Sequence, residues 1–472
     1  MLSRRQFLTI GSAFSVGFLG LRSLLLRDKP LYTDTDLVCS GYGPLKNDPQ
    51  QMIDLPEGFR YRVLSWAGQT MDDGLLLPGM PDGMAAFPGP DGLTILIRNH
   101  ELTSSDRVGP FGPDHHLLKL VDRGKVYDHG NGKTPACGGT TTLVFNSKTQ
   151  EVVSQFMSLA GTIRNCAGGP TPWGSWISCE ETVYTAGHTI ALEEEIWTDQ
   201  DHGYNFEVPA TTHIGIVDPV PLREMGRFNH EAVAVAPDTS IVYQTEDRAD
   251  GLIYRFIPKI PGQLRAGGRL QALALRDQAS ADTRNWSFWT SGIPVGERLP
   301  VRWLDLEKTS PPQDDLRTRG HAAGAALFAR GEGMWFSDGV AYFACTGGGR
   351  RQNGQIWSYR PSPTEGTPQE QDQPGTLELF LEPDDSTLLK SADNLTVAPW
   401  GDVVICEDRS DNVVRLVGVT PQGTLYTLAN CLLHSEFAGA TFTPDGSTLL
   451  VNVQGKGVTL AITGPWSSVH QS

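Results

Sequence analysis

Pairs of adjacent acidic residues follow short apolar stretches at three places in this sequence. The pairs are Glu180-Glu181, Glu246-Asp247 and Glu407-Asp408. Neighbouring carboxylates disfavour each other's ionised form unless a cation lies close to both. Their oxygens suit Ca²⁺ or Mg²⁺, with Mn²⁺ or ferric iron as further options. Cys179 directly precedes the first pair, and a thiolate indicates a transition metal. The pattern therefore predicts a mixed metal site.

The paired acids belong to a repeat that occurs six times. Each copy has an apolar stretch, a turn rich in Pro, Asp or Gly, and a second apolar stretch, which is typical of a β-hairpin. The copies span 84–101, 167–181, 231–247, 333–348, 395–408 and 440–454. Further strand-like runs separate them, and no long amphipathic helix is evident. Four short strands per copy predict an all-β fold, a six-bladed β-propeller with loop insertions, over residues 50–465 as a single domain.

In a propeller, the first strand of each hairpin lines the central channel and the second runs back beside it. The start of the first strand and the end of the second therefore lie at the same mouth of the channel. Acidic or amide residues precede most of the first strands: Asp82, Asn165, Glu231, Glu332, Asp393, Asn394 and Glu436. The predicted metal ligands are Glu101, Cys179, Glu180, Glu181, Glu231, Glu246, Asp247, Glu332, Glu407 and Asp408. An alternative role for the single acids Glu101 and Glu231, and also for the paired acids Glu246, Asp247, Glu407 and Asp408, is that of solvated rim charges. For Cys179 the alternative is a packing residue.

Arg330 stands in Arg-Gly-Glu-Gly, two residues before Glu332. Residues two apart on a strand point the same way, so this arginine is expected beside the cations. A cation in such a place needs an anionic guest, and a phosphate group matches its fork of donors. Arg330 is therefore predicted to bind substrate phosphate, the alternative being a local ion pair with a carboxylate.

The seven cysteines are an odd number and include no C-x-x-C pair, which excludes a zinc ribbon. Small apolar thiols are common at buried strand ends, so most of them are expected to be packing residues. This expectation covers Cys137, Cys166, Cys345, Cys406 and Cys431. The formal net charge of −16 argues against nucleic acid or an anionic membrane as a partner. A closed propeller offers no sheet edges, which favours a monomer.

The N-terminus resembles a twin-arginine export signal. Ser3-Arg4-Arg5-Gln6-Phe7-Leu8 precedes an apolar stretch that is short for a membrane span. Residues 1–30 are thus expected to address the protein to the twin-arginine export machinery, and to be either removed or retained as a membrane anchor. The protein is then periplasmic or extracellular. A chance Arg-Arg before apolar residues is the alternative.

Segments from the signal to the last repeat resemble the PhoX-type alkaline phosphatase family. They include RNHE (98–101), NCAGGPTPWGSWISCEE (165–181), RFNHEA (227–232), TEDR (245–248), ARGEGMWF (329–336), CEDR (406–409) and SEFAGATFTPDG (435–446). The resemblance implies an exported six-bladed propeller that hydrolyses phosphate monoesters of small molecules with calcium and ferric iron, one cysteine being bound to iron.

By this resemblance, one set of residues is expected on the iron side and another as calcium or bridging ligands. The iron-side candidates are Cys179, Glu246 and Glu332, and the others are Glu101, Glu180, Glu181, Asp247, Glu407 and Asp408. Arg330 would hold the phosphate, with metal-assisted in-line attack on phosphorus. The family also places a lysine against the phosphate, yet no lysine occurs between Lys148 and Lys259.

Two other functions fit a propeller with an acidic channel mouth. A calcium-dependent lactonase or esterase would place calcium there without needing a thiolate. A non-catalytic propeller that binds a sugar or a protein would use the acids for structural calcium. The nature of the bound metal separates both from a phosphatase.

Overall fold

The computed structural model describes residues 38–467 except 107, 192–193, 288–291 and 410–412. The chain divides into two units, Met1–Cys39 and Ser40–Ser472. The predicted export signal, residues 1–30, lies outside the described residues. None of the described helices is long and apolar enough to cross a membrane.

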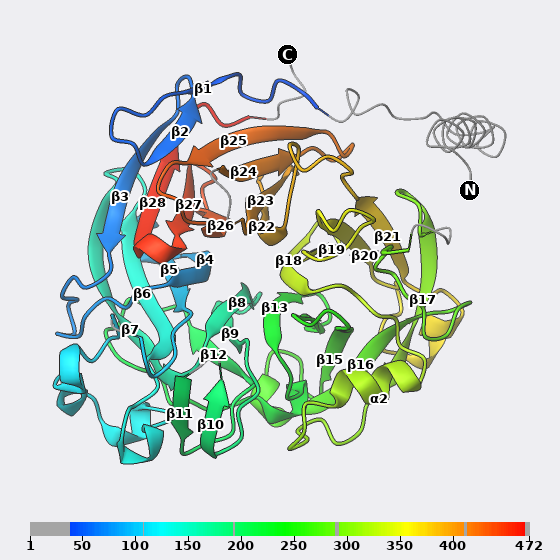
Figure 1. Cartoon of the computed structure of the whole chain (residues 1–472), viewed down its shortest axis with the longest axis horizontal. Coiled ribbons are helices and arrows are strands. Elements are labelled where there is room, and N and C mark those ends of the chain that lie inside the picture. Colours follow the sequence, from blue (N-terminus) through cyan, green and yellow to red (C-terminus); the bar gives the residue numbers. More distant parts are fainter. Residues whose placement is uncertain (1–37, 107, 192–193, 288–291, 410–412, 468–472) are drawn as a thin grey trace, which may run out of the picture. The chain divides into compact units, whose positions relative to one another are not determined.

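Short strands dominate the Ser40–Ser472 unit, and they surround a common centre in a propeller-like arrangement (Figure 1). A single α-helix, α2 (Leu316–Ala322), occurs among the described residues, together with short 3-10 turns. The prediction of an all-β fold is thus confirmed for the described part of the chain.

The first half of the unit forms two sheets around the centre and a separate hairpin. One sheet has the order β4 (Pro81–Pro88), β5 (Thr94–His100), β6 (Gly138–Asn146), β7 (Glu151–Thr162). The next has the order β8 (Asn165–Pro170), β9 (Ser175–Glu180), β12 (Asn205–Pro209). The hairpin pairs β10 (Gly187–Ala191) with β11 (Glu194–Thr198).

A nine-stranded sheet follows, in which β17 (Arg298–Asp305) joins two groups of four strands. The first group is β13 (His230–Val235), β14 (Val242–Glu246), β15 (Ile253–Pro258) and β16 (Gly268–Leu275). The second is β18 (Gly331–Ser337), β19 (Val340–Cys345), β20 (Gln355–Arg360) and β21 (Thr376–Leu381). β17 pairs with β16 and, through its first three residues, with β21.

The last two sheets combine both ends of the unit. One has the order β22 (Ala392–Val397), β23 (Val403–Glu407), β24 (Val414–Val419), β25 (Leu425–Cys431), β2 (Ile53–Pro56), β1 (Leu45–Lys46). The other has the order β26 (Phe437–Phe442), β27 (Thr448–Val453), β28 (Val458–Thr463), β3 (Arg60–Trp66). Strands from the start of the unit thus complete sheets formed by its end, which closes the arrangement.

All six predicted hairpins are antiparallel strand pairs, from β4/β5 to β26/β27. The turn between β26 and β27 shows why the sequence folds this way. The Gly446 N–H donates to the Thr443 carbonyl at 2.8 Å, and Gly446 has a φ of 69°, which glycine adopts without strain. The Asp445 carboxylate accepts from the Thr443 and Ser447 hydroxyls.

The first strand of each hairpin is an inner strand, and the inner strands contact one another in sequence around the centre. β4 contacts β8, β8 contacts β13, and the series continues through β18, β22 and β26 back to β4. Glycines permit this close approach. A Cβ on Gly83 would lie 2.5 Å from the Ala167 Cα, and one on Gly333 would lie 2.7 Å from the Asn394 Cα.

Candidate metal centre

Five inner strands share an irregularity at the same place. In β4, β8, β13, β18 and β22, the pairing register shifts directly after the first residue. Such a bulge re-aims the side chains next to it. The second residue of each of these strands is a metal-binding type, and we call this set the first row: Asp82, Cys166, Glu231, Glu332 and Asp393.

The residue that follows each second strand forms a second row, held by one recurring backbone hydrogen bond. In each hairpin this residue donates its N–H to the carbonyl of the residue just before the inner strand, at 2.9 to 3.2 Å. The second row is Glu101, Glu181, Asp247, Thr346, Asp408 and Gln454. The recurring bond keeps the second row beside the start of the first row.

Three overlapping groups of potential metal ligands arise from the two rows. Within each group, one ligand atom per residue lies within 4.8 Å of the others. The groups are Asp82–Glu101–Cys166, Cys166–Glu181–Glu231 and Glu231–Glu332–Asp393. Because Cys166 and Glu231 are each shared by two groups, the groups form one continuous cluster, which we call the acidic cluster.

Glu231 carries the strongest indication that this cluster is built for cations. Its side chain is fully buried, and neither carboxylate oxygen has a hydrogen-bond partner in the described part of the chain. Leaving a buried charged group unpaired costs several kcal/mol, roughly 3–5 for a broken buried ion pair. Burial raises the pKa of Glu231 far above its usual value, and Glu181 and Asp393 raise it further. The donor set therefore fits a bound cation.

Other carboxyl groups in the acidic cluster and beside it share this environment. Burial raises the pKa of Asp393 to about 7, with repulsion from Asp408 adding to the effect. Burial likewise raises the pKa of Glu436 to about 10, and Asp408 is again the main neighbour. Asp82 has one buried oxygen without a partner among the described groups, while Gln454 donates to the other at 2.7 Å. So much carboxylate in one buried place requires positive charge.

The first acid of each adjacent pair points away from the cluster. Glu180 accepts from His202 Nδ1 at 2.6 Å and from the Ile163 N–H at 3.0 Å. Glu246 accepts from the Tyr254 hydroxyl at 2.7 Å.

Glu407, the first acid of the third pair, also has a partner outside the cluster: it accepts from Arg415 Nη2 at 2.6 Å. Successive side chains alternate between the two faces of a strand, so only the second acid of each pair can turn to the channel. Glu180, Glu246 and Glu407 thus lie outside the three ligand groups, and their sequence-based assignment as metal ligands stays a prediction.

Cys179 also lies apart from the acidic cluster. It is fully buried in an apolar layer with Ile177, Phe228 and Val233. Burial raises the pKa of its thiol far above the usual value. The cluster contains Cys166 instead, whose Sγ lies 3.3 Å from the Asp82 carboxylate. The structure thus places Cys166 in a ligand group and Cys179 outside the three groups, and the sequence-based expectations for both cysteines stay predictions.

Asp82, Cys166 and Asp393 are the cluster residues that the sequence-based ligand set did not contain. A signal for them existed, since they stand at the same point of the repeat as Glu231 and Glu332. Four predicted ligands do lie in the groups: Glu101, Glu181, Glu231 and Glu332. Asp247 and Asp408 lie in the second row, outside the three groups.

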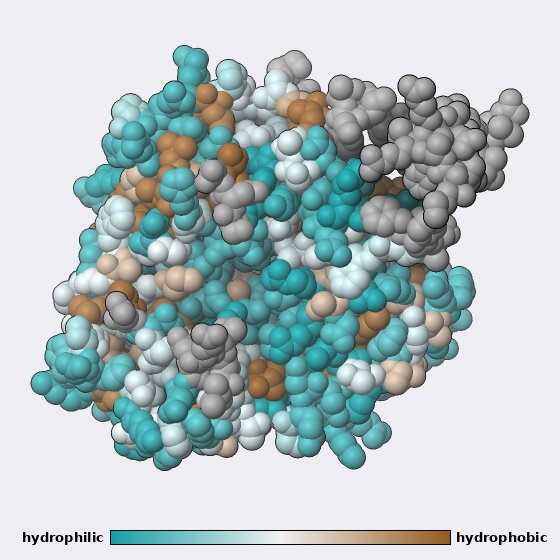
Figure 2. Space-filling model, viewed as in Figure 1, coloured by the Kyte–Doolittle hydropathy of each residue, from teal (hydrophilic) through white to brown (hydrophobic). Residues whose placement is uncertain are grey.

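Two arginines pair with these acids. Arg330 binds the Asp247 carboxylate through Nε and Nη2, at 2.8 and 3.0 Å, and Glu332 through Nη2 at 2.7 Å. Arg164 Nη2 lies 2.7 Å from Glu101 and 2.5 Å from Glu181. The space-filling view shows mainly hydrophilic side chains over the centre of the strands (Figure 2).

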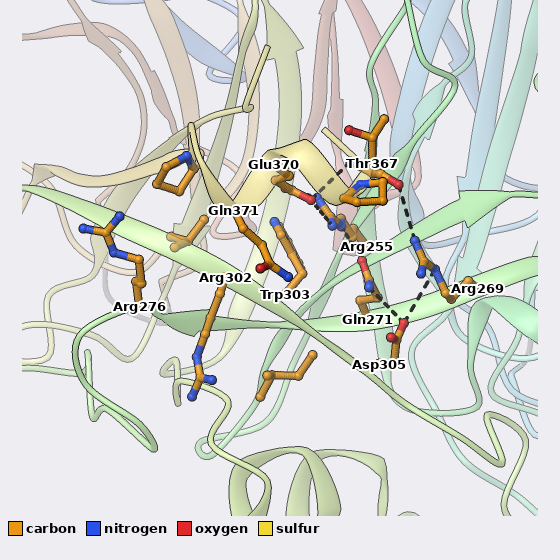
Figure 3. A pocket seen from close by; sticks show the side chains of 15 residues that line it. Arg255, Arg269, Gln271, Arg276, Arg302, Trp303, Asp305, Thr367, Glu370 and Gln371 are labelled. Atoms are coloured by element: carbon orange, nitrogen blue, oxygen red, sulfur yellow. Dashed lines mark hydrogen bonds and ion pairs between the residues drawn. The ribbon is translucent and has the colours of Figure 1, made fainter. Parts of the chain in front are cut away.

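A cavity of about 710 Å³ lies elsewhere, along β15–β17 and the loop before β21, and holds none of the predicted site residues (Figure 3). Its floor is a network of satisfied groups. Arg255 donates to Gln271 at 2.7 Å and to Glu370 at 2.6 Å, and it stacks over Trp303. The acidic cluster, with its unpaired carboxylate oxygens, is therefore the better candidate for the functional site.

Comparison with known proteins agrees with the sequence-based resemblance. The family described as alkaline phosphatase PhoX matches residues 40–457. The chain belongs to the PhoX alkaline phosphatase family. It is accordingly a phosphatase, and members of this family depend on metal.

One similar solved structure is that of Pseudomonas fluorescens PhoX in complex with vanadate, which is described as a transition state analogue. Its TM-score is 0.67 and its sequence identity 17%, and the match covers 91% of this chain and 98% of that one. At this identity it supports the PhoX fold alone. A Xanthomonas campestris gluconolactonase matches with a TM-score of 0.35 and 14% identity over 86% of this chain and 95% of its own, too low to carry an argument. No curated protein shows significant sequence similarity to the chain.

Proposed function

We propose that this PhoX-family protein hydrolyses phosphate monoesters of small molecules at a cluster of calcium and iron held by the two rows of residues. The observation that carries the proposal is Glu231, a fully buried carboxylate without any hydrogen-bond partner among the described residues. It joins the ligand group containing Cys166 to the group containing Glu332. A thiolate among carboxylates suits a transition metal, and groups of oxygen alone suit calcium.

The six-bladed architecture and the domain limits are part of the proposal. The nine-stranded sheet is read as two blades of four strands, β13–β16 and β18–β21, bridged by β17. Six inner strands in mutual contact and six recurrences of the second-row hydrogen bond support this count. One propeller domain would then span residues 50–465.

When bound, the cations would supply Lewis-acid stabilisation of the charge on the phosphoryl group. Cys166 and Glu231 would hold the iron side, with Glu332, Asp393, Asp82, Glu101 and Glu181 as the remaining ligands. The substrate would enter from the open mouth, where the Arg330 side chain is 41% exposed. Arg330 would donate hydrogen bonds to phosphate oxygens in place of those it now gives to Asp247 and Glu332.

Export through the twin-arginine machinery completes the proposal. Residues 1–30 carry the signal, and the folded protein acts as a monomer in the periplasm or outside the cell. Folding before export suits a protein whose metals must be loaded first.

The direct test is to purify the folded protein with its metals and measure iron, calcium and hydrolysis of p-nitrophenyl phosphate. The expected result is stoichiometric iron together with calcium, activity that a chelator lowers by at least about tenfold, and recovery when both metals return. A protein that binds both metals and releases no phosphate would contradict the proposal. Calcium without iron would instead favour a structural role for the acids.

A further inference from the structure

Arg164 and Arg330 occupy equivalent positions of the repeat. Each immediately precedes an inner strand, β8 or β18, and each has a positive φ, 49° and 56°. Arginine rarely adopts this conformation, which costs about 1–3 kcal/mol and persists only where the surroundings impose it. Both are fixed by the same two backbone bonds. The Arg164 N–H donates to the Leu102 carbonyl and its carbonyl accepts from Glu181, each at 2.9 Å.

Likewise, the Arg330 N–H donates to the Arg248 carbonyl, and the Arg330 carbonyl accepts from the Thr346 N–H, each at 2.9 Å. Two arginines are thus held in a strained conformation at the same mouth of the channel. Arg330 follows from its motif in the sequence, whereas the equivalence of Arg164 emerges only from the strand register.

The donors of the two guanidinium groups are used differently. Arg330 gives its planar Nε–Nη2 edge to both oxygens of Asp247. Arg164 contacts carboxylates through Nη2 alone, and its Nε is buried without an acceptor among the described groups. A buried donor without an acceptor costs roughly 1–3 kcal/mol. Nε of Arg164 therefore lacks an acceptor, and Nη2 can join it in binding a bridging acceptor only when Glu101 or Glu181 turns to a cation instead.

The neighbours of Arg164 also indicate an anionic guest. The carboxylates that it touches, Glu101 and Glu181, belong to two different ligand groups. Once cations bind those carboxylates, a guanidinium beside them has no acceptor of its own and faces further positive charge. Its side chain is 25% exposed, while its Nε is buried. A phosphoryl group offers two oxygens at the spacing of the guanidinium edge.

We propose that Arg164 is a second phosphate-binding residue, whose Nε–Nη2 edge binds two non-ester oxygens of a phosphate monoester dianion at the acidic cluster. This inference rests on the proposed function. Glu181, a partner of Arg164, and Glu332, a partner of Arg330, each have a carboxylate oxygen within 4.8 Å of one of Glu231. The two arginines therefore serve one site, and together they favour a terminal phosphate over a diester, which has only two non-ester oxygens.

The test compares Arg164→Gln, Arg164→Lys and the wild type, each purified with its metals. Arg298→Gln serves as a matched control, because Arg298 is an exposed arginine paired with Glu378 outside the channel. The measurements are metal content, kcat and KM for p-nitrophenyl phosphate, and the inhibition constant of inorganic phosphate. The expected result for Arg164→Gln is a 10- to 100-fold rise in that inhibition constant and in KM, on the order of one charge-assisted hydrogen-bonded pair, at unchanged metal content.

Arg164→Lys should recover only part of the loss, since an ammonium group keeps the charge but not the planar edge. The inference is overturned if a metal-loaded Arg164→Gln enzyme binds inorganic phosphate as the wild type does, whatever happens to kcat. If Arg164→Gln loses its metals, the metal-loaded lysine variant decides by the same constant. Failure of the proposed function would appear differently, as a wild-type enzyme that does not hydrolyse the monoester at all.

Discussion

Glu180 and Glu181 are adjacent in the sequence, both are buried, and they belong to different regions of the molecule. Glu180 lies between sheets, where His202 and backbone N–H groups satisfy its oxygens. Glu181 lies in the acidic cluster beside Arg164 and Glu231. The oxygens of Glu180 thus have hydrogen-bond donors within the protein, whereas the acidic cluster gathers more negative charge than the protein itself compensates.

The difference between the two regions separates structural acids from functional ones. A carboxylate with satisfied partners contributes to stability, and its loss is felt in folding. A buried carboxylate without partners destabilises the fold until a cation binds it. Such a carboxylate therefore indicates a ligand site. Substituting one member of each adjacent or equivalent pair should therefore affect either stability or metal binding.

The largest difference is expected between the two cysteines. Cys166→Ser should lower phosphatase activity by at least about 100-fold and remove iron, because the thiolate of the acidic cluster is lost. Cys179→Ser should keep its metals and activity while losing roughly 1–3 kcal/mol of unfolding free energy, because a hydroxyl replaces a thiol in an apolar layer. Activity assays, metal analysis and denaturant unfolding measure these effects. Equal iron loss in both variants would remove the distinction between the regions.

The pair Glu407 and Asp408 should separate stability from metal binding. Glu407→Gln leaves the buried Arg415 without its ion-pair partner, so the free energy of unfolding should fall by about 3–5 kcal/mol. Asp408→Asn should change stability little without metals, because no ion pair of Asp408 occurs among the described residues, and should weaken calcium binding. Thermal unfolding with and without calcium tests this. A stability loss of similar size in Asp408→Asn would contradict the assignment of the two faces.

A smaller, pH-dependent effect is expected from His202. Burial lowers the pKa of this histidine, but Glu180 and Asp128 outweigh burial and raise it to about 9. A raised pKa stabilises the fold below the unfolded value near 6.5, and this contribution is lost as the pH rises through about 9. The wild type should therefore lose roughly 2–3 kcal/mol between pH 6.5 and 9.5 from this group. His202→Asn should be less stable at pH 6 and show a flatter decline; parallel pH profiles for both proteins would disprove the linkage.

The sequence was sufficient to predict the six hairpins and the approach of acidic residues at the strand ends to one another. Turns such as Thr443-Pro444-Asp445-Gly446 determine where strands reverse, and their residue types can be recognised in the sequence. The sequence did not show to which side of its strand each strand-end side chain points. A shift of one residue moves every side chain to the opposite face, and the bulges of the inner strands introduce such a shift.

Cys166 illustrates the limit. A buried cysteine is ordinarily a packing residue, and nothing beside it in the sequence resembles a ligand pair. Its role emerges when β8 is aligned with β13 and β18, where Glu231 and Glu332 hold the same position. The proposed ligand set therefore rests on pairing in space rather than on adjacency in sequence.

Anomalous X-ray diffraction at the iron absorption edge, on crystals of the protein loaded with iron and calcium, locates the iron itself. The first row is expected to hold the iron, with an anomalous peak at bonding distance from Cys166 Sγ and Glu231 among its ligands. Iron at Cys179, or at any place away from the inner-strand starts, would contradict the account.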